Sequence, residues 1–211
     1  MHLIYLHGLD SDPNAIKAQI TQAYCDTHLA SILPAFRLSR PNLNLPPDDV
    51  VALLTDLIQQ EANTVLIGSS LGGYFATLMS DLTGVPAVLL NPSIRPDVSF
   101  RRFLANNFHG QTLADDTVIY TTVGGWRIRF GDLAWFSQHR LQVKQPSRLK
   151  VLVQLGDELL DAAATQDFYA SQGADVLALA GGDHRISDFE RHVATVADWA
   201  VQLTKAQTVR T

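Results

Sequence analysis

The chain has 211 residues, of which 46% are hydrophobic and 18% are charged, and its formal net charge is −5. This composition is typical of a soluble globular protein of one domain, residues 1–211, and excludes a disordered chain; the acidic balance argues against a nucleic-acid partner, because such domains carry a basic patch. Cys25 is the only cysteine, which rules out an intrachain disulfide and fits a reducing, cytoplasmic setting.

The first part of the chain alternates short apolar runs with helix-like stretches. Residues 3–6 predict a strand, and residues 32–38 predict a second one, in which Pro34 indicates an edge position or a late start. A helix between them is indicated by apolar residues at helical spacing, namely Ile16, Ile20, Ala23 and Tyr24. A second helix opens at residues 46–49, and its apolar face consists of Val50, Leu53, Leu54, Leu57 and Ile58.

The rest of the chain continues this alternation. Strands are predicted over residues 64–67, 87–90, 149–155 and 175–179, and helices over residues 73–80 and 162–172. Ser187 and Glu190 have the spacing of a capping box, which predicts that a final helix begins there. The apolar residues that share one face of this helix are Phe189, Val193, Val196, Ala197 and Ala200.

Such an alternation predicts an α/β fold with a mostly parallel sheet of about six strands and helices on both faces. Ligands of such sheets bind beyond the carboxyl ends of the strands. Polar residues follow four of the predicted strands: His7, Ser70, Asp157 and His184. The sequence therefore predicts a functional site at that edge of the sheet.

Residues 95–147 interrupt the pattern with about fifty residues that contain no clear strand–helix unit. Their large aromatic residues are Phe100, Phe103, Phe108, Trp126, Phe130, Trp135 and Phe136. Long insertions between regular elements are usually functional, so we expect residues 95–147 to form a lid-like insertion. The alternative for each aromatic residue is that it packs the insertion onto the sheet.

The pentapeptide Gly68-Ser69-Ser70-Leu71-Gly72 lies between a predicted strand and a predicted helix, which is the layout of a nucleophile elbow. Glycines suit this turn because they carry no Cβ and let the strand and the helix approach closely. The helix would point its free N–H groups toward Ser70. The neighbouring Ser69 should point elsewhere, and we assign it a packing or hydrogen-bonding role.

A serine is a poor nucleophile unless a base takes its proton and an acid orients that base. In hydrolases with this elbow the chain order is serine, acid, histidine, and Ser70, Asp157 and His184 follow that order. Two carboxylates compete with Asp157. Asp161 is also placed to cap the next helix, and Glu158 to be a solvated loop charge.

Other histidines compete with His184. His28 and His192 resemble exposed helix residues, whereas His109 and His139 lie in the 95–147 insertion, where a lid or substrate role stays open. The glycine-flanked loop around His184 favours it, because such a loop can turn sharply and bring the side chain back over the elbow.

An oxyanion hole needs two backbone donors. We assign the N–H of Leu71, directly after the nucleophile, and the N–H of Leu9, in the loop after the first strand. His7 opens that loop and is expected to support it by hydrogen bonding. No cofactor is expected, because the sequence has no His-x-x-x-His pair or thiolate cluster for a metal and no Gly-x-Gly-x-x-Gly loop for a dinucleotide.

Several blocks of the sequence occur together in a recognisable order. They are Ile4-Tyr5-Leu6-His7-Gly8-Leu9, then Ser11, Pro13 and Lys17-Ala18, then residues 67–77, 90–96, 154–158 and 181–184. In these blocks the chain resembles the YqiA/YcfP-like esterases, a small branch of the α/β-hydrolase superfamily. The resemblance is poor beyond Arg95-Pro96, so it carries least information about substrate specificity.

The resemblance implies a compact hydrolase of carboxylic esters, with small-molecule acyl ester or thioester substrates. It gives Ser70 the role of nucleophile, Asp157 that of acid and His184 that of base. It also implies six parallel strands in the order 2-1-3-4-5-6, because only one strand fits before His7 and Gly8.

The sequence leaves two other functions open. One is a non-catalytic, hydrolase-like scaffold that binds a ligand or a protein through its aromatic insertion; the complete set of serine, acid, base and oxyanion loops argues against it. The other is an acyltransferase that uses the same triad but passes the acyl group to an alcohol or an amine. The chain shows neither a signal-peptide pattern nor an apolar run long enough to span a bilayer, so no membrane span is expected.

Overall fold

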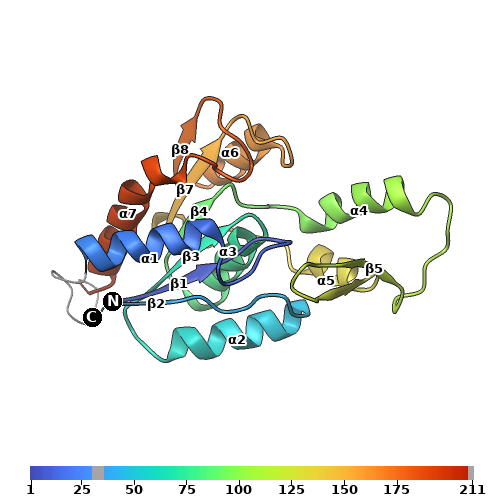
Figure 1. Ribbon diagram of the computed structural model, residues 1–211, viewed down its shortest axis with the longest axis horizontal. Coiled ribbons are helices and arrows are strands. Elements are labelled where there is room, and N and C mark those ends of the chain that lie inside the picture. The colour runs from blue at the N-terminus through green and yellow to red at the C-terminus, as the bar shows by residue number, and fades with distance from the viewer. Residues whose placement is uncertain (30–35, 209–211) are drawn as a thin grey trace.

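The centre of the fold is a six-stranded parallel sheet, found in a computed structural model that describes residues 1–29 and 36–208. Its strand order is β2-β1-β3-β4-β7-β8, with all neighbours parallel (Figure 1). The strands are β1 (His2–Leu6), β2 (Arg37–Ser39), β3 (Thr64–Ser69), β4 (Ala87–Leu90), β7 (Leu149–Gln154) and β8 (Asp175–Leu179). Counted along the chain, these strands confirm the predicted order 2-1-3-4-5-6.

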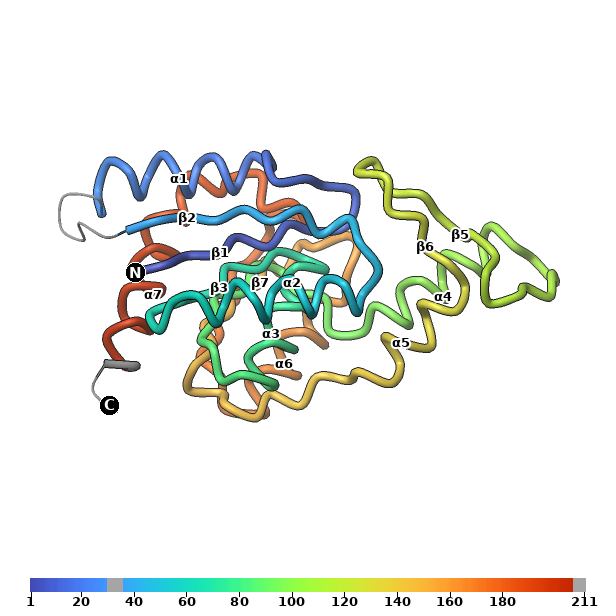
Figure 2. The backbone as a smooth tube through the Cα atoms, turned by 90° about the horizontal axis from the view of Figure 1, so that it is seen from below, coloured from blue at the N-terminus to red at the C-terminus, as the bar shows by residue number. Residues whose placement is uncertain are grey.

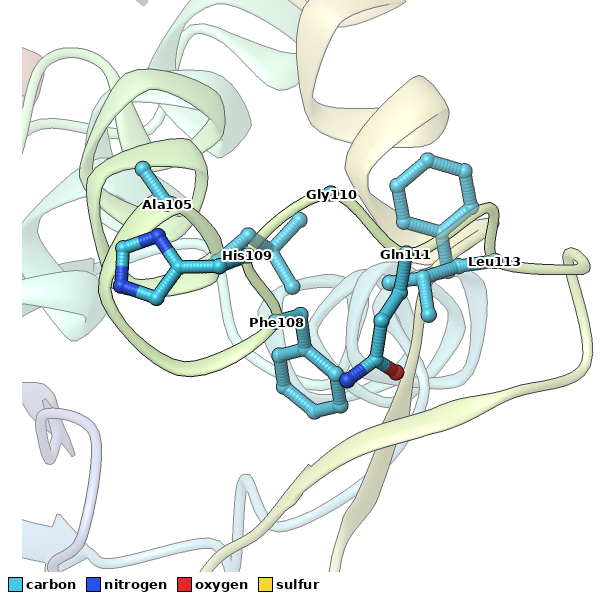
Figure 3. Close-up of a pocket in the computed structure, with 8 residues that line it drawn as sticks. Ala105, Phe108, His109, Gly110, Gln111 and Leu113 are labelled. Carbon is cyan, nitrogen blue, oxygen red and sulfur yellow. The ribbon is translucent and has the colours of Figure 1, made fainter.

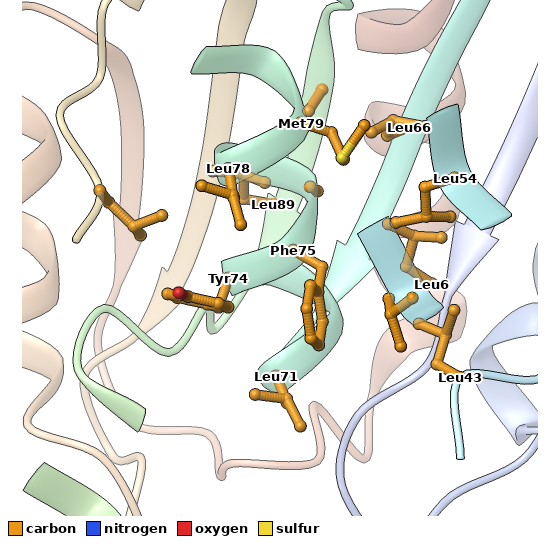
Figure 4. Packing of buried hydrophobic residues seen from close by; sticks show 14 of the residues in the cluster. Leu6, Leu43, Leu54, Leu66, Leu71, Tyr74, Phe75, Leu78, Met79 and Leu89 are labelled. Carbon is orange, nitrogen blue, oxygen red and sulfur yellow. The ribbon is translucent and has the colours of Figure 1, made fainter. Parts of the chain in front are cut away.

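Helices cover both faces of the sheet, because alternate residues of each strand point to opposite faces. Helices α1 (Ile16–His28) and α7 (Val193–Thr208) bury one face, in a cluster that includes Leu3, Val65 and Val88. Helices α2 (Pro47–Gln59), α3 (Leu71–Thr83) and α6 (Ala162–Ser171) bury the other, against side chains such as Leu66 and Leu89 (Figure 4). The parallel sheet with helices on both faces that the alternation predicted is therefore present.

Two sequence expectations need correction or restriction. The prediction that a capping box at Ser187 and Glu190 starts the final helix is wrong. A 3-10 turn (Phe189–Arg191) precedes the helix, and α7 begins only at Val193. The physical reason is that the Ser187 N–H donates to the side chain of Asp183 (3.1 Å), so the chain is still part of the preceding loop. Residues 32–35 of the second predicted strand lie outside the described residues. The observed strand β2 overlaps only the C-terminal end of the predicted range, 32–38.

Residues 95–147 form a small unit beside the sheet, at the right of Figures 1 and 2. It consists of α4 (Pro96–Asn107), an antiparallel hairpin of β5 (Val118–Thr121) and β6 (Arg127–Arg129), and α5 (Asp132–Gln138). Several of its aromatic residues are packing residues: Phe136 is 1% exposed and its ring lies 5.4 Å from that of Tyr74 on α3. Within the described residues, no helix combines the length and the apolar character needed to cross a membrane.

We predict that Leu66→Ala lowers the free energy of unfolding by about 2–5 kcal/mol. Leu66 is fully buried on β3 between α2 and α3, so the substitution removes buried apolar surface and leaves a cavity. Urea denaturation followed by circular dichroism measures the change. Leu82→Ala is the matched control, because Leu82 is 57% exposed and its loss should cost less than about 0.5 kcal/mol; equal effects of the two variants would contradict the assigned core.

Candidate active site

Ser70 occupies a strained turn between β3 and α3. Its backbone angles are φ 56° and ψ −118°, a conformation that a residue with a side chain rarely adopts. An added Cβ at Gly68 would overlap the carbonyl oxygen of Gly72, and one at Gly72 would overlap that of Leu6. Strand and helix approach as closely as the pentapeptide predicts, and Ser69 is buried at the end of β3.

The structure brings Ser70, His184 and Asp157 together from three loops at the carboxyl edge of the sheet. The Nε2 atom of His184 lies 3.0 Å from Ser70 Oγ, and its Nδ1 atom lies 2.8 Å from Asp157 Oδ2. An ionised carboxylate can only accept, so Nδ1 carries the ring proton and Nε2 is free to accept the proton of Ser70. The side chains of His184 and Asp157 are only 11% and 2% exposed.

Asp157 is held as an ionised carboxylate. Burial is the largest influence and by itself raises the pKa of this group. Hydrogen bonds from His184 and from the N–H groups of Leu160 and Leu159 oppose it, and together they hold the pKa of Asp157 below its usual value. Asp157 can therefore orient the imidazole and stabilise its positive charge.

The competing carboxylates have other positions. Asp161 caps α6, because its Oδ1 accepts from the N–H of Ala164 (2.9 Å), as its sequence position indicated. Glu158 is exposed in the loop, as expected, and its Oε2 in addition accepts the backbone N–H of His184 (2.9 Å). Glu158 thus helps to fix the loop that carries the histidine.

Further side chains hold the loop of His184 by its peptide groups. The Nδ2 atom of Asn91 donates to the carbonyl oxygens of Asp183 (3.0 Å) and His184 (3.2 Å). The Oε1 atom of Gln154 accepts the N–H of Asp183 (2.9 Å). Lys17 on α1 donates from Nζ to the carbonyl oxygen of Arg185 (2.5 Å), and burial lowers the pKa of Lys17 to about 8.

Sequence reasoning missed these positioning residues. Asn91 directly follows β4 and has a φ of 41°, and its Oδ1 accepts the N–H of Gln154 (2.8 Å). Asn91-Pro92 and Lys17-Ala18 lie in the sequence blocks that carry the family resemblance. Their presence in these blocks is the signal in the sequence that could have pointed to Asn91 and Lys17. Their roles depend on contacts between residues that are far apart in the chain.

The loop after β1 lies beside Ser70. A Cβ on Gly8 would come within 3.1 Å of Ser70 Cβ and 3.6 Å of Ser70 Oγ. Within residues 1–29 and 36–208, the N–H groups of Leu9 and Leu71 donate to no other protein group. In the described residues both predicted donors are thus free; Leu71 directly follows Ser70, and Leu9 follows Gly8, which lies beside Ser70.

His7 fixes the peptide group that carries the Leu9 N–H. The Leu43 N–H donates to His7 Nε2 (2.9 Å), so the proton of the neutral ring sits on Nδ1, which donates to the Gly8 carbonyl oxygen (2.9 Å). Because the two ends of a trans peptide point in opposite directions, holding the Gly8 oxygen sets the direction of the Leu9 N–H. Burial lowers the pKa of His7, which keeps the ring neutral at pH 7.

The other histidines lie elsewhere. His28 is exposed on α1, as expected. His192 is not an exposed helix residue: it is half-buried and lies 3.2 Å from Asp188 Oδ2. His139 stacks on Trp135, with ring centroids 3.9 Å apart.

His109 lines a hollow of about 390 Å³ at the end of α4 (Figure 3). The hollow is bounded by residues of the 95–147 segment, among them Phe108, Leu113 and Phe130, and contains none of the triad residues. This hollow is therefore separate from the candidate triad. In the described part of the chain, no group of three or more His, Cys, Asp or Glu side chains is arranged to hold a metal ion.

Residues 2–201 match the model of the uncharacterised protein family UPF0227, and the chain belongs to that family. A UPF0227 protein of Vibrio vulnificus (strain CMCP6) is 24% identical over 176 residues, which cover 79% of this chain and 83% of the relative. A UPF0227 protein of Shewanella woodyi is 30% identical over 99 residues, covering 44% of this chain and 52% of the relative. The matched part thus spans about half the length of the Shewanella protein.

Solved structures share the fold. The mouse alpha/beta hydrolase domain-containing protein 10 superposes with a TM-score of 0.67 and 20% identity, covering 96% of this chain and 90% of its own. Est1E from Butyrivibrio proteoclasticus gives a TM-score of 0.68 and 11% identity, with coverages of 99% and 88%; another Est1E structure holds ferulic acid. At these identities the likeness establishes the α/β-hydrolase fold.

We predict that His7→Asn destabilises the protein more at pH 7.5 than at pH 5. The variant leaves the Leu43 N–H without its acceptor, which costs about 1–3 kcal/mol while the wild-type ring is neutral. The folded pKa of His7 lies below its unfolded value, so the unfolded chain binds more protons as the pH falls. The contribution of His7 is complete above about pH 6.5 and declines below it, by at most about 1.4 kcal/mol per pH unit.

Urea denaturation of both proteins between pH 5 and pH 7.5 measures the difference. His28→Asn is the surface control, and its effect should stay within about 0.5 kcal/mol. If the difference in unfolding free energy between the wild type and His7→Asn is constant across this pH range, the result contradicts a buried, neutral His7.

Proposed function

We propose that this member of the UPF0227 family is a serine hydrolase that cleaves carboxylic esters or acyl thioesters through an acyl-enzyme. The observation that carries the proposal is the continuous chain of hydrogen bonds from Ser70 Oγ through His184 to Asp157. A structural role would not require a strained serine, an imidazole of fixed tautomer and a buried carboxylate in series. The free, buried Cys25 fits a reducing, cytoplasmic setting for this activity.

In the first half of the proposed reaction, Ser70 Oγ attacks the acyl carbonyl while its proton passes to His184 Nε2. The N–H groups of Leu9 and Leu71 stabilise the negative charge that develops on the carbonyl oxygen. The tetrahedral intermediate collapses, the alcohol or thiol leaves with the proton from Nε2, and the acyl group stays on Ser70.

In the second half, a water molecule gives a proton to Nε2 and attacks the acyl-enzyme carbonyl. The second intermediate collapses, the proton returns to Ser70 Oγ, and the carboxylic acid is released. Asp157 keeps its charge throughout and stabilises the imidazolium that forms twice in the cycle. Each step conserves atoms and protons without any further reactant.

Exposed apolar side chains on the site loops favour a substrate with an apolar acyl group. Leu9 is 37% exposed beside the proposed oxyanion hole, and Leu159 is 64% exposed two residues after Asp157. Exposed large apolar side chains that gather near a site often contact a ligand. Ferulic acid, which the Est1E structure holds, is an aromatic carboxylic acid and thus belongs to the class of products that this reaction would release.

We predict that Ser70→Ala removes hydrolysis of p-nitrophenyl butyrate, because no other hydroxyl lies within reach of His184 Nε2 in the described residues. The loss should be at least about a thousandfold in kcat, since a triad acts as a unit. Release of p-nitrophenol measures the rate. Circular dichroism should show that the variant is folded.

Ser69→Ala is the matched control and should retain most of the activity, because Ser69 is buried and, in the described residues, the ring of His184 bonds to Ser70 and Asp157 and not to Ser69. A fluorophosphonate probe followed by peptide mass spectrometry should label Ser70 alone. Unchanged turnover in Ser70→Ala, or labelling at Ser69, would overturn the proposed nucleophile.

We predict that Asn91→Asp lowers kcat about tenfold or more while KM changes little. The new side chain keeps the acceptor for the Gln154 N–H but turns a carboxylate oxygen toward the carbonyl oxygens of Asp183 and His184. Repulsion between these oxygens should displace His184 from Ser70, and misplaced catalytic groups lose about this much. The control is Asn107→Asp, on α4; equal rates in Asn91→Asp and wild type would refute the positioning role.

A further inference from the structure

The hairpin of β5 and β6 is bound to the loop after β1 through the side chain of Asp10. The carboxylate Oδ1 of Asp10 accepts the backbone N–H of Val123 (3.0 Å), and Oδ2 accepts the hydroxyl of Tyr120. Tyr120 belongs to β5, and Val123 belongs to the turn that follows it. Figure 2 shows the yellow-green tip of the hairpin beside the blue loop after β1.

Asn44 makes a second link between the same two segments. Its Nδ2 donates to the carbonyl oxygen of Ser11 (3.0 Å), and its Oδ1 accepts the hydroxyl of Thr122 (2.8 Å). A Cβ on Gly124 would overlap the Asn44 side chain. The turn of the hairpin therefore sits closely against this loop.

Asp10 is the residue directly after Leu9, whose N–H is one of the two proposed oxyanion donors. Its φ is 53°, a left-handed conformation that aspartate tolerates better than most residues but that still needs support. The two hydrogen bonds from the hairpin supply support on one side of Leu9. His7 supplies it on the other side, by holding the Gly8 carbonyl oxygen.

We propose that Asp10 is a positioning residue that couples the 95–147 segment to the oxyanion hole, so that the Leu9 N–H is in place only when the hairpin is seated. This inference rests on the proposed hydrolase function. Asp10 holds the loop through Tyr120 and Val123 and does not itself touch the reacting atoms. The lid-like segment would then act on the chemistry through the direction of one peptide N–H.

The pair Asp10 and Tyr120 allows a sharp test. Asp10→Ala removes both bonds to the hairpin, whereas Tyr120→Phe removes only the hydroxyl. With p-nitrophenyl butyrate, we expect Asp10→Ala to lower kcat about tenfold with KM nearly unchanged, because an oxyanion donor acts in the transition state. Tyr120→Phe should give a smaller loss, and in the Asp10→Ala background it should have no further effect.

Two control variants distinguish the loss of the contacts between Asp10 and the hairpin from a general loss of stability. Asp12→Ala removes a carboxylate of the same loop that, within the described part of the chain, accepts a hydrogen bond from the nearby Asn14 N–H and from no hairpin group, and it should keep wild-type kcat. Tyr24→Phe removes a tyrosine hydroxyl on α1, remote from the hairpin, and should do the same. Additive losses in the Asp10 and Tyr120 double variant, or an equal loss in Asp12→Ala, would overturn the proposal.

Hydrogen–deuterium exchange tests the link without any activity. Asp10→Ala should speed exchange of the hairpin amides over residues 118–129, and Asp12→Ala should not. If wild type hydrolyses no ester or thioester, the proposed function fails while the exchange result still decides whether Asp10 holds the hairpin. If exchange is faster but kcat is unchanged, the coupling to the oxyanion hole is refuted.

Discussion

The backbone of Ser70 is the constraint on which the rest of the site depends. A residue with a positive φ and this ψ costs about 1–3 kcal/mol and persists only where its surroundings hold it. The Ser70 N–H donates to Leu90 on β4 (3.1 Å), and its carbonyl oxygen accepts from Gly73 (2.9 Å), Tyr74 (3.2 Å) and Ser93 (3.0 Å). The central strands, α3 and the loop after β4 thus combine to impose the one conformation that presents the hydroxyl at the edge of the sheet.

The loops that face Ser70 are also held in place by their surroundings, since side chains from outside each loop bond to its peptide groups. Four side chains, those of Asn91, Gln154, Glu158 and Lys17, hold the peptide groups of three successive residues of the His184 loop, 183–185. A neutral hydrogen bond contributes about 0.5–1.5 kcal/mol and one to a charged group about 1.5–3 kcal/mol, and the loop is held by several of both kinds. Together they leave the imidazole few alternatives to a position between Asp157 and Ser70, which is the kind of preorganisation that catalysis requires.

Local patterns predicted the strands of the sheet and the candidate triad residues, because hydrophobic alternation and glycine spacing act over a few neighbours, whereas the strand order came from the family resemblance. The cap at Asp161 was predictable for the same reason. Glu158 and Asp10 were not, because their partners lie 26 and 110 residues away in the chain. The capping box failed where a local pattern met a competing contact, the bond from the Ser187 N–H to Asp183.

The 95–147 segment is attached to the rest of the protein by apolar packing and by hydrogen bonds. Near α5, Phe136 packs on Tyr74 and Phe75, and the Tyr74 hydroxyl donates to the His139 carbonyl oxygen (2.6 Å). Exposing one such aromatic side chain costs about 2–3 kcal/mol, and α3, on which it packs, begins directly after Ser70. The hairpin meets the β1 loop through polar groups, but its Ile119, Trp126 and Ile128 side chains are buried in the same apolar cluster as Phe136. Both α5 and the hairpin are therefore anchored in the core, and the contacts of Asp10 add a polar link where the hairpin reaches the loop beside Ser70.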